Sequence, residues 1–185
     1  FQSLCSDEYT RDVLEQEVWP EFAERPEISR RMTFRDVEEI NLRELGVAGD
    51  QLWLKMGPEA GSDAGTLQHV EAERVTSPAN MPQSSRGGNL IEQGVELNAR
   101  GQPVAYHVAD MSDWGYVQAS TATPIPAAQC LHVIGRFRRS SQTRAMPILV
   151  SGLPIAHRLD DILTSEAISW QVLSRLAFVW QREAH

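Results

Sequence analysis

Four arginines lie close together in a chain whose formal net charge is −8. They are Arg136, Arg138, Arg139 and Arg144, and the polar residue Gln142 lies among them. A guanidinium group donates several hydrogen bonds in a fixed planar geometry that matches a carboxylate or a phosphate. We therefore interpret this stretch as a candidate contact surface, for carboxylates of a neighbouring subunit or for DNA phosphates. A solvated loop with ordinary surface ion pairs, which contribute little to stability, explains the same composition equally well.

Side chains that ligate metals are scattered along other parts of the chain. His69, Glu71 and Glu73 alternate in one strand-like stretch, and His107 and Asp110 lie near the end of another. A metal site needs three or four such groups that converge in one geometry. Because the chain contains none of the spacing motifs of zinc or calcium sites, we interpret these residues as solvated strand positions. We predict neither a metal nor a cofactor.

A catalytic nucleophile has equally little support. Cys130 and His132 would be neighbours on one face of a strand, but no third residue is placed to orient the histidine. Ser151 lacks the flanking glycines of a Gly-x-Ser-x-Gly turn, and no glycine-rich phosphate loop occurs. We predict no catalytic residues and no enzyme activity. Cys5 and Cys130 are interpreted as free thiols of an intracellular protein.

Length and composition limit the domain that must position these residues. The chain of 185 residues suffices for one domain with a core, or for one domain and an arm. Residues 1–3 resemble the remnant of a cleaved purification tag and are left out of the fold prediction. No run of apolar residues is long enough for a membrane span, so no membrane partner is predicted. The acidic balance is unsuited to tight wrapping of duplex DNA, although DNA could slide past such a surface.

Two N-terminal helices are predicted. The first begins at residues 6–8, which supply a capping residue and early acidic side chains, and Pro20 is expected to end or kink it. The second begins at Thr33 and Asp36, whose spacing is typical of a capping pair. Gly46 is expected to end this second helix in a left-handed conformation.

A small, mostly antiparallel β region is predicted to follow, which makes the fold class α+β. The clearest unit is a β-hairpin, formed by two alternating runs around a glycine-bearing turn. The strand-like runs lie at 51–56, 67–71, 94–97, 102–108 and 131–134. Three stretches, 57–66, 76–89 and 110–128, are expected to be loops, with Trp114 and Tyr116 anchoring the last.

A long helix is predicted from residue 155 to the end of the chain. Apolar residues spaced three and four apart form a stripe along it, and a helix of about thirty residues spans about 45 Å. We expect this stripe to pack against a neighbour along its length. The residues expected to make that contact are Leu159, Ile162, Leu173, Leu176 and Trp180. Because the pattern still runs at the last residue, we expect the chain to be part of a longer protein, divided into an α+β domain (4–146) and a truncated helix (147–185).

Several short blocks of this sequence, in order, resemble the first half of lambda-type phage portal proteins. The most specific block is GVE at 94–96 with GQPVAYHV at 101–108. The others are WPEFA at 19–23 with RMTF at 31–34, ERVTSP at 73–78, IPA at 125–127 with LHV at 131–133, and QTRAMP at 142–147. One departure is Ala145, where the family usually has glycine, and family members continue well past the final helix.

The resemblance implies a structural, non-enzymatic protein, of which this chain is a fragment. Residues 4–146 would form most of the wing of the portal, and residues 147–185 would begin its stem. Portal proteins of this kind form a ring, typically a dodecamer, at one capsid vertex. The implied partners are copies of itself, the terminase, capsid and head-completion proteins, and double-stranded DNA that passes through the channel. The implied location is the virion, and the host cytoplasm during assembly.

Two functions from other classes stay open on the residues alone. One is an independent intracellular binding module that dimerises through its C-terminal helix. The other is an enzyme whose site is spread over the loops, which would need converging titratable groups in a pocket.

Overall fold

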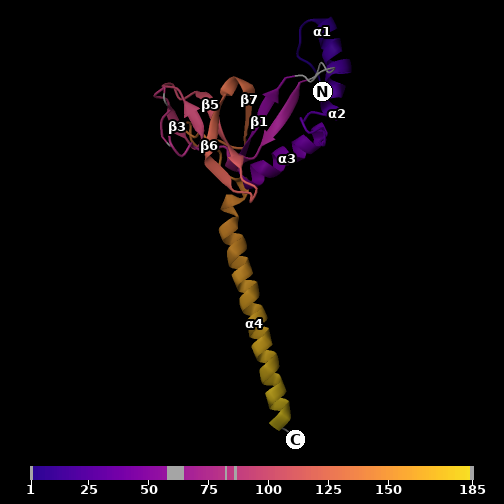
Figure 1. Ribbon diagram of the computed structural model, residues 1–185. Coiled ribbons are helices and arrows are strands. Elements are labelled where there is room, and N and C mark those ends of the chain that lie inside the picture. Colours follow the sequence, from indigo (N-terminus) through magenta and orange to yellow (C-terminus); the bar gives the residue numbers. More distant parts are fainter. Residues whose placement is uncertain (1, 58–64, 82, 86, 184–185) are drawn as a thin grey trace. The chain divides into compact units, whose positions relative to one another are not determined.

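The fold is α+β, as predicted, in a computed structural model that describes residues 2–57, 65–81, 83–85 and 87–183 (Figure 1). Within the C-terminal helix, side chains are described as far as residue 175. The chain divides into two compact units, Phe1–Ile148 and Leu149–His185. In its described residues the first unit holds three α-helices and two antiparallel sheets, and the second consists mainly of one long helix.

The N-terminal helical segment consists of α1 (Glu8–Val13), a π-helix η1 (Leu14–Val18) and α2 (Trp19–Glu24). Asp7 caps its start, where the side chain accepts a hydrogen bond from the backbone N–H of Thr10 at 2.8 Å. Of the two expectations for Pro20, an end of the helix is wrong, because the segment continues to Glu24. Pro20 lies in the first turn of α2, and the wider π turn directly precedes it.

The second predicted helix is α3 (Phe34–Val47), and its capping pair is confirmed. The Thr33 side chain accepts from the backbone of Asp36, and the Asp36 carboxylate accepts from the Thr33 backbone at 2.8 Å. The expected end at Gly46 is wrong, since Gly46 is the penultimate residue of the helix. The left-handed residue is Gly49, with φ of 94°, where the chain turns into the first strand.

The first sheet has three strands in the order β2-β1-β7, and both pairings are antiparallel. Its strands are β1 (Asp50–Met56), β2 (Thr66–Val70) and β7 (Cys130–Ile134). The three strand-like runs predicted at these positions are confirmed. β1 is the central strand, and most of it is buried. The start of β1 therefore lies inside the domain, and its first residue, Asp50, places a carboxylate there.

The second sheet has four strands in the order β3-β4-β5-β6, and every pairing is antiparallel. The predicted hairpin is confirmed as the pair β4 and β5. The four strands are β3 (Leu90–Glu92), β4 (Val95–Leu97), β5 (Pro103–Met111) and β6 (Val117–Pro126).

The strand β6 corrects the prediction that residues 110–128 form a loop. β6 runs through Pro124 and Pro126, which lack a backbone donor, and prolines are tolerated in strands at a sheet edge. β6 is such an edge, since it pairs only with β5 within the described residues. Trp114 and Tyr116 do not anchor this region, because they are 86% and 75% exposed in the turn between β5 and β6.

The predicted loop at 76–89 contains no helix or strand in its described residues, and positions 82 and 86 lie outside them. It is tied to the second sheet, because the backbone N–H of Ala79 donates to the Ala119 carbonyl at 3.1 Å. In the predicted loop 57–66, positions 58–64 lie outside the described residues.

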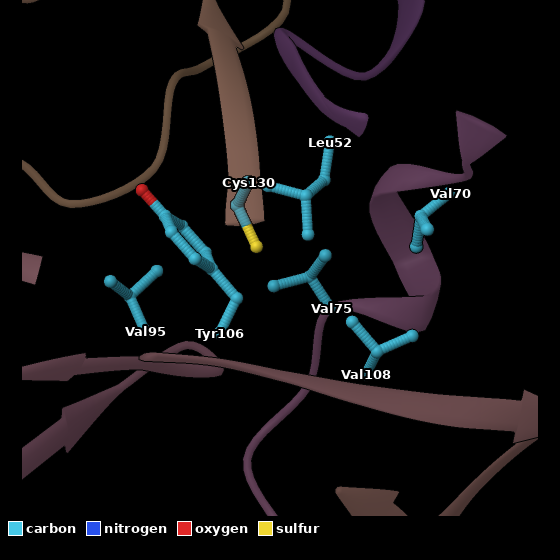
Figure 2. Close-up of a cluster of buried hydrophobic side chains, with 7 residues drawn as sticks. All are labelled: Leu52, Val70, Val75, Val95, Tyr106, Val108 and Cys130. Carbon is cyan, nitrogen blue, oxygen red and sulfur yellow. The ribbon is translucent and has the colours of Figure 1, made fainter. Parts of the chain in front are cut away.

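The hydrophobic core joins the two sheets (Figure 2). Its buried side chains come from strands of both sheets and from the segment between them, and the sulfur of Cys130 points into the cluster. Burying each large apolar side chain stabilises the fold by about 1.5–3 kcal/mol. The cluster consists of Leu52, Val70, Val75, Val95, Tyr106, Val108 and Cys130.

The predicted long helix is confirmed as α4 (Leu153–Glu183), whose 31 residues span about 46 Å. Its apolar side chains are exposed as far as they are described, and Leu159, Ile162 and Leu173 are 56%, 57% and 57% exposed. The side chains of Leu176 and Trp180 lie outside the described part of α4. None of the helices in the described residues has the length and apolar character that a membrane crossing needs.

Candidate functional site

The arginine loop, residues 135–145, follows β7 and presents three of its arginines outward. Arg136, Arg138 and Arg139 are exposed, and none of them forms an ion pair with another described residue. Gln142 fixes the backbone of the loop. Its side-chain oxygen accepts from the Arg138 N–H at 2.9 Å, and its amide donates to the carbonyl two residues further on at 2.7 Å. Contact with another subunit or with DNA stays a prediction for these residues.

Arg144 differs from the other three arginines because its guanidinium group points into the domain. It forms a two-pronged ion pair with Asp50, in which Nη2 lies 2.8 Å from Oδ1 and Nε bonds Oδ2. The remaining donors reach the backbone carbonyls of Ala72 at 2.8 Å, Val75 at 2.9 Å and Gln93 at 3.2 Å. A single side chain therefore connects the end of the arginine loop to three separate segments of the domain.

Asp50 lies at the centre of this arrangement and is 1% exposed. Its carboxylate also accepts from His132 Nε2 at 3.1 Å and from the backbone N–H of Ala145 at 3.1 Å. Burial alone would raise the pKa of Asp50, but the hydrogen bonds from His132 and Arg144 and the charge of Arg144 lower it to about 2. On its other side, the His132 ring lies 3.3 Å through Nδ1 from the Tyr106 hydroxyl. We call these four side chains, Asp50, Arg144, His132 and Tyr106, the buried polar network.

The local backbone explains why these groups meet. β1 and β7 pair with Leu52 opposite His132, and Asp50 shares a face with Leu52 because side chains alternate along a strand. Gly49 lets the arginine loop approach β1 closely, since a Cβ atom there would lie 2.5 Å from a backbone atom of Met146. Gly135 also donates its N–H to the Gly49 carbonyl at 3.1 Å.

Sequence reasoning did not find Asp50, His132 or Tyr106 as partners of the arginine loop. His132 was of interest only as a neighbour of Cys130, but its ring bonds Asp50, which lies 82 positions away. Cys130 is buried, which raises the pKa of its thiol, and its sulfur lies 3.5 Å from the Pro126 carbonyl. The sequence carries one signal for this site. The acidic residue Asp50 comes directly before the predicted strand at 51–56, which is apolar on its buried face.

A second buried acid–histidine pair lies in the four-stranded sheet. Glu96 Oε2 and His107 Nε2 are 3.2 Å apart, and Asn89 donates to the other oxygen of Glu96 at 2.8 Å. Burial favours a higher pKa for Glu96, but hydrogen bonds from Asn89, Ser85 and His107 lower it overall. This pair joins β4 to β5, and among the residues that the structure describes no third acid, cysteine or histidine joins it to form a metal site.

The residues considered for a metal site are separated by the fold. His69 lies 3.0 Å through Nε2 from the side-chain oxygen of Gln51, whereas His107 belongs to the pair with Glu96. In the described part of the chain, no three His, Cys, Asp or Glu side chains are placed to hold a metal ion. Chemically, the buried polar network holds an ionised carboxylate inside the domain and uses its charge to fix the arginine loop.

The lowered pKa of Asp50 makes the stability of the domain depend on pH. The folded pKa of about 2 lies below the ordinary aspartate pKa of 3.8, so the contribution of Asp50 to stability is complete above about pH 5 and is lost as pH falls towards 2. We expect the free-energy difference between wild type and Asp50→Asn to shrink by about 2 kcal/mol between those pH values. Urea unfolding of both proteins at several pH values measures it, and a difference that stays constant would contradict the assignment.

The fold and the buried polar network together define a class of protein. It is an α+β domain whose polar centre is occupied by its own side chains, followed by a long helix that exposes large apolar residues. Over residues 6–185 the sequence matches the family model described as phage portal protein, lambda family. The chain therefore belongs to the lambda family of phage portal proteins, and the resemblance is confirmed. A search of curated proteins found no match. Membership of this family makes the protein a structural component associated with a phage capsid, and it implies self-association.

Proposed function

We propose that this chain forms part of the ring at one capsid vertex through which double-stranded DNA is packaged and ejected. In this proposal residues 4–146 act as the wing and residues 147–185 begin the stem. Its partners are copies of itself in a ring, with twelve as the typical number for such portals, together with the terminase and with capsid and head-completion proteins. The protein acts in the virion and, during assembly, in the host cytoplasm.

The observation that carries the proposal is that α4 exposes apolar side chains on two of its sides. Leu159 and Leu173 lie on one side, and both are more than half exposed. At about 100° per residue, Ile168 and Val172 lie on roughly the opposite side, and they are 56% and 52% exposed. A helix with two exposed apolar sides needs a neighbour on each of them. A closed ring of copies supplies two neighbours to every helix.

The charge of the chain also supports passage of DNA. The net charge of −8 disfavours tight binding to phosphates, and DNA that is held tightly does not move through a channel.

The experiment that tests the proposal places acidic residues on the apolar side of α4. Leu159→Asp with Leu173→Asp removes two apolar contacts per helix and adds two charges to each interface. Losing a single buried leucine costs about 2–5 kcal/mol, so ring formation should fall by far more than tenfold. Light scattering and electron microscopy of the portal carrying these changes measure ring formation, and the DNA content of phage particles measures packaging.

A matched control adds a charge of the same sign elsewhere on the helix. Gln171→Asp adds an acidic side chain at an exposed position between the two apolar sides, about 60° or more around the helix from Leu159, Leu173, Ile168 and Val172. The control variant should form rings and package DNA as wild type does. Intact rings in the leucine variant would contradict the proposal. A stable dimer in place of a ring in the wild-type portal would favour the alternative of a binding module that dimerises through this helix.

A further inference from the structure

The turn between β5 and β6 exposes two aromatic side chains on an ordered backbone. We call residues 112–116 the aromatic tip. Trp114 is 86% exposed and Tyr116 is 75% exposed. The backbone N–H of Ser112 donates to the Tyr116 carbonyl at 2.8 Å, and Gly115 donates to the Ser112 carbonyl at 2.9 Å. Large aromatic surfaces held in a fixed conformation are typical anchors of protein–protein contacts, because little entropy is lost when they bind.

A pocket of about 450 Å³ lies at the other end of the same sheet, beside the arginine loop. We call it the sheet pocket. Val95 and Tyr106 form its buried floor, Leu97 and Ile134 line its wall, and the 58% exposed Phe137 lies at its rim. Polar side chains of the arginine loop, Ser140, Gln142 and Thr143, complete the lining, so the pocket is suited to an aromatic side chain that also carries a polar group, such as the indole N–H of tryptophan.

The tip and the surroundings of the pocket have opposite charges. From Gln102 to Gly135 the chain contains no lysine or arginine, and the β5–β6 hairpin carries the exposed acids Asp110 and Asp113. Around the pocket, the adjoining hollows are lined by Arg100, Arg138 and Arg139, and by the single acid Glu92. Such complementarity accelerates the correct association and disfavours a contact between two tips.

The tip and the pocket of one chain cannot meet each other. The pocket takes residues from the beginning of β5, including Pro103 and Tyr106, whereas the tip follows Met111 at the end of that strand. A strand of this length separates its two ends by roughly 27 Å. A tip that fills such a pocket therefore belongs to a different copy of the chain. Contacts between two different surfaces repeat from one copy to the next and close into a ring when the rotation allows it.

We propose that the aromatic tip of one subunit inserts Trp114 into the sheet pocket of its neighbour, with Asp113 beside Arg138 and Arg139. This inference deepens the proposed ring function and depends on it for the identity of the partner, a second copy of this chain. It assigns the predicted arginine surface to subunit contact, with the tip as its counterpart.

A charge exchange tests the pairing directly. Asp113→Arg should weaken ring formation by about tenfold, and so should Arg138→Asp with Arg139→Asp, because each places like charges together. The combination of all three changes should restore a large part of the loss. Asp12→Arg, an exposed acid on α1 that receives the same charge change, is the matched control and should have no effect. Additive losses without restoration would overturn the pairing.

Disulfide trapping separates this inference from the proposed function. In a Cys5→Ser background, Trp114→Cys with Phe137→Cys should give covalent chains of many copies after mild oxidation, whereas either single cysteine should give dimers at most. If rings form and the two cysteines do not link, the inference is overturned and the ring function stands. If the cysteines link only as reciprocal dimers, the contact is real and the ring is contradicted. A chain that neither links nor associates overturns both.

Discussion

The Arg144→Met variant will unfold with a free energy about 3–5 kcal/mol lower than that of the wild-type chain. Arg144 donates to both oxygens of Asp50, which is 1% exposed, and methionine leaves that carboxylate buried without its cation. The carbonyls of Ala72, Val75 and Gln93 lose a donor at the same time. Urea or thermal unfolding, followed by circular dichroism, measures the loss.

Arg139→Met is the matched control for this substitution. Arg139 lies in the same loop, is exposed, and forms no ion pair with a described residue, so its replacement should change stability by less than about 0.5 kcal/mol. Arg144→Lys should recover only part of the loss, because an ammonium group cannot bond both carboxylate oxygens in the planar geometry of a guanidinium. Equal stabilities of the Arg144→Met and Arg139→Met variants would disprove the anchoring role of Arg144.

The second large effect is expected at Gly49, where alanine should destabilise the domain strongly. A Cβ atom at this position would lie 2.5 Å from Met146 C, 2.7 Å from Pro147 N and 2.8 Å from Ala145 O, all backbone atoms that a rotamer change cannot move. The residue also has φ of 94°, which side-chain-bearing residues rarely adopt. We expect the free energy of unfolding to fall by about 1–3 kcal/mol because of the strained backbone conformation. The overlap of the added Cβ atom with these backbone atoms should lower it by a further amount of about 1–3 kcal/mol.

Gly88 separates these two contributions. It has φ of 81°, but a Cβ atom there would meet no heavy atom within 4 Å. Gly88→Ala should therefore show the conformational cost alone, and the difference between the two variants measures the overlap with the arginine loop. If Gly49→Ala is no less stable than Gly88→Ala, the close approach of the loop to β1 is not a stabilising feature of the domain.

The elements that the sequence predicted correctly are those encoded by local patterns. The β4–β5 hairpin follows from alternation around a glycine turn, and α3 follows from the Thr33 and Asp36 capping pair. α4 follows from apolar spacings of three and four residues. β6 was missed because Pro124 and Pro126 indicate a loop locally, while the strand is stabilised by pairing with β5 along its length.

The sequence by itself therefore determined the fold class, the acidic balance, the long apolar helix and, through its ordered blocks, the portal family. Only the tertiary structure decided that Arg144 lies inside the domain while Arg136, Arg138 and Arg139 face outward, although all four look alike along the chain. The reason is physical. Helix and strand periods arise from neighbouring residues, whereas the environment of Arg144 is set by Asp50, 94 positions away, which only the folded chain brings within reach.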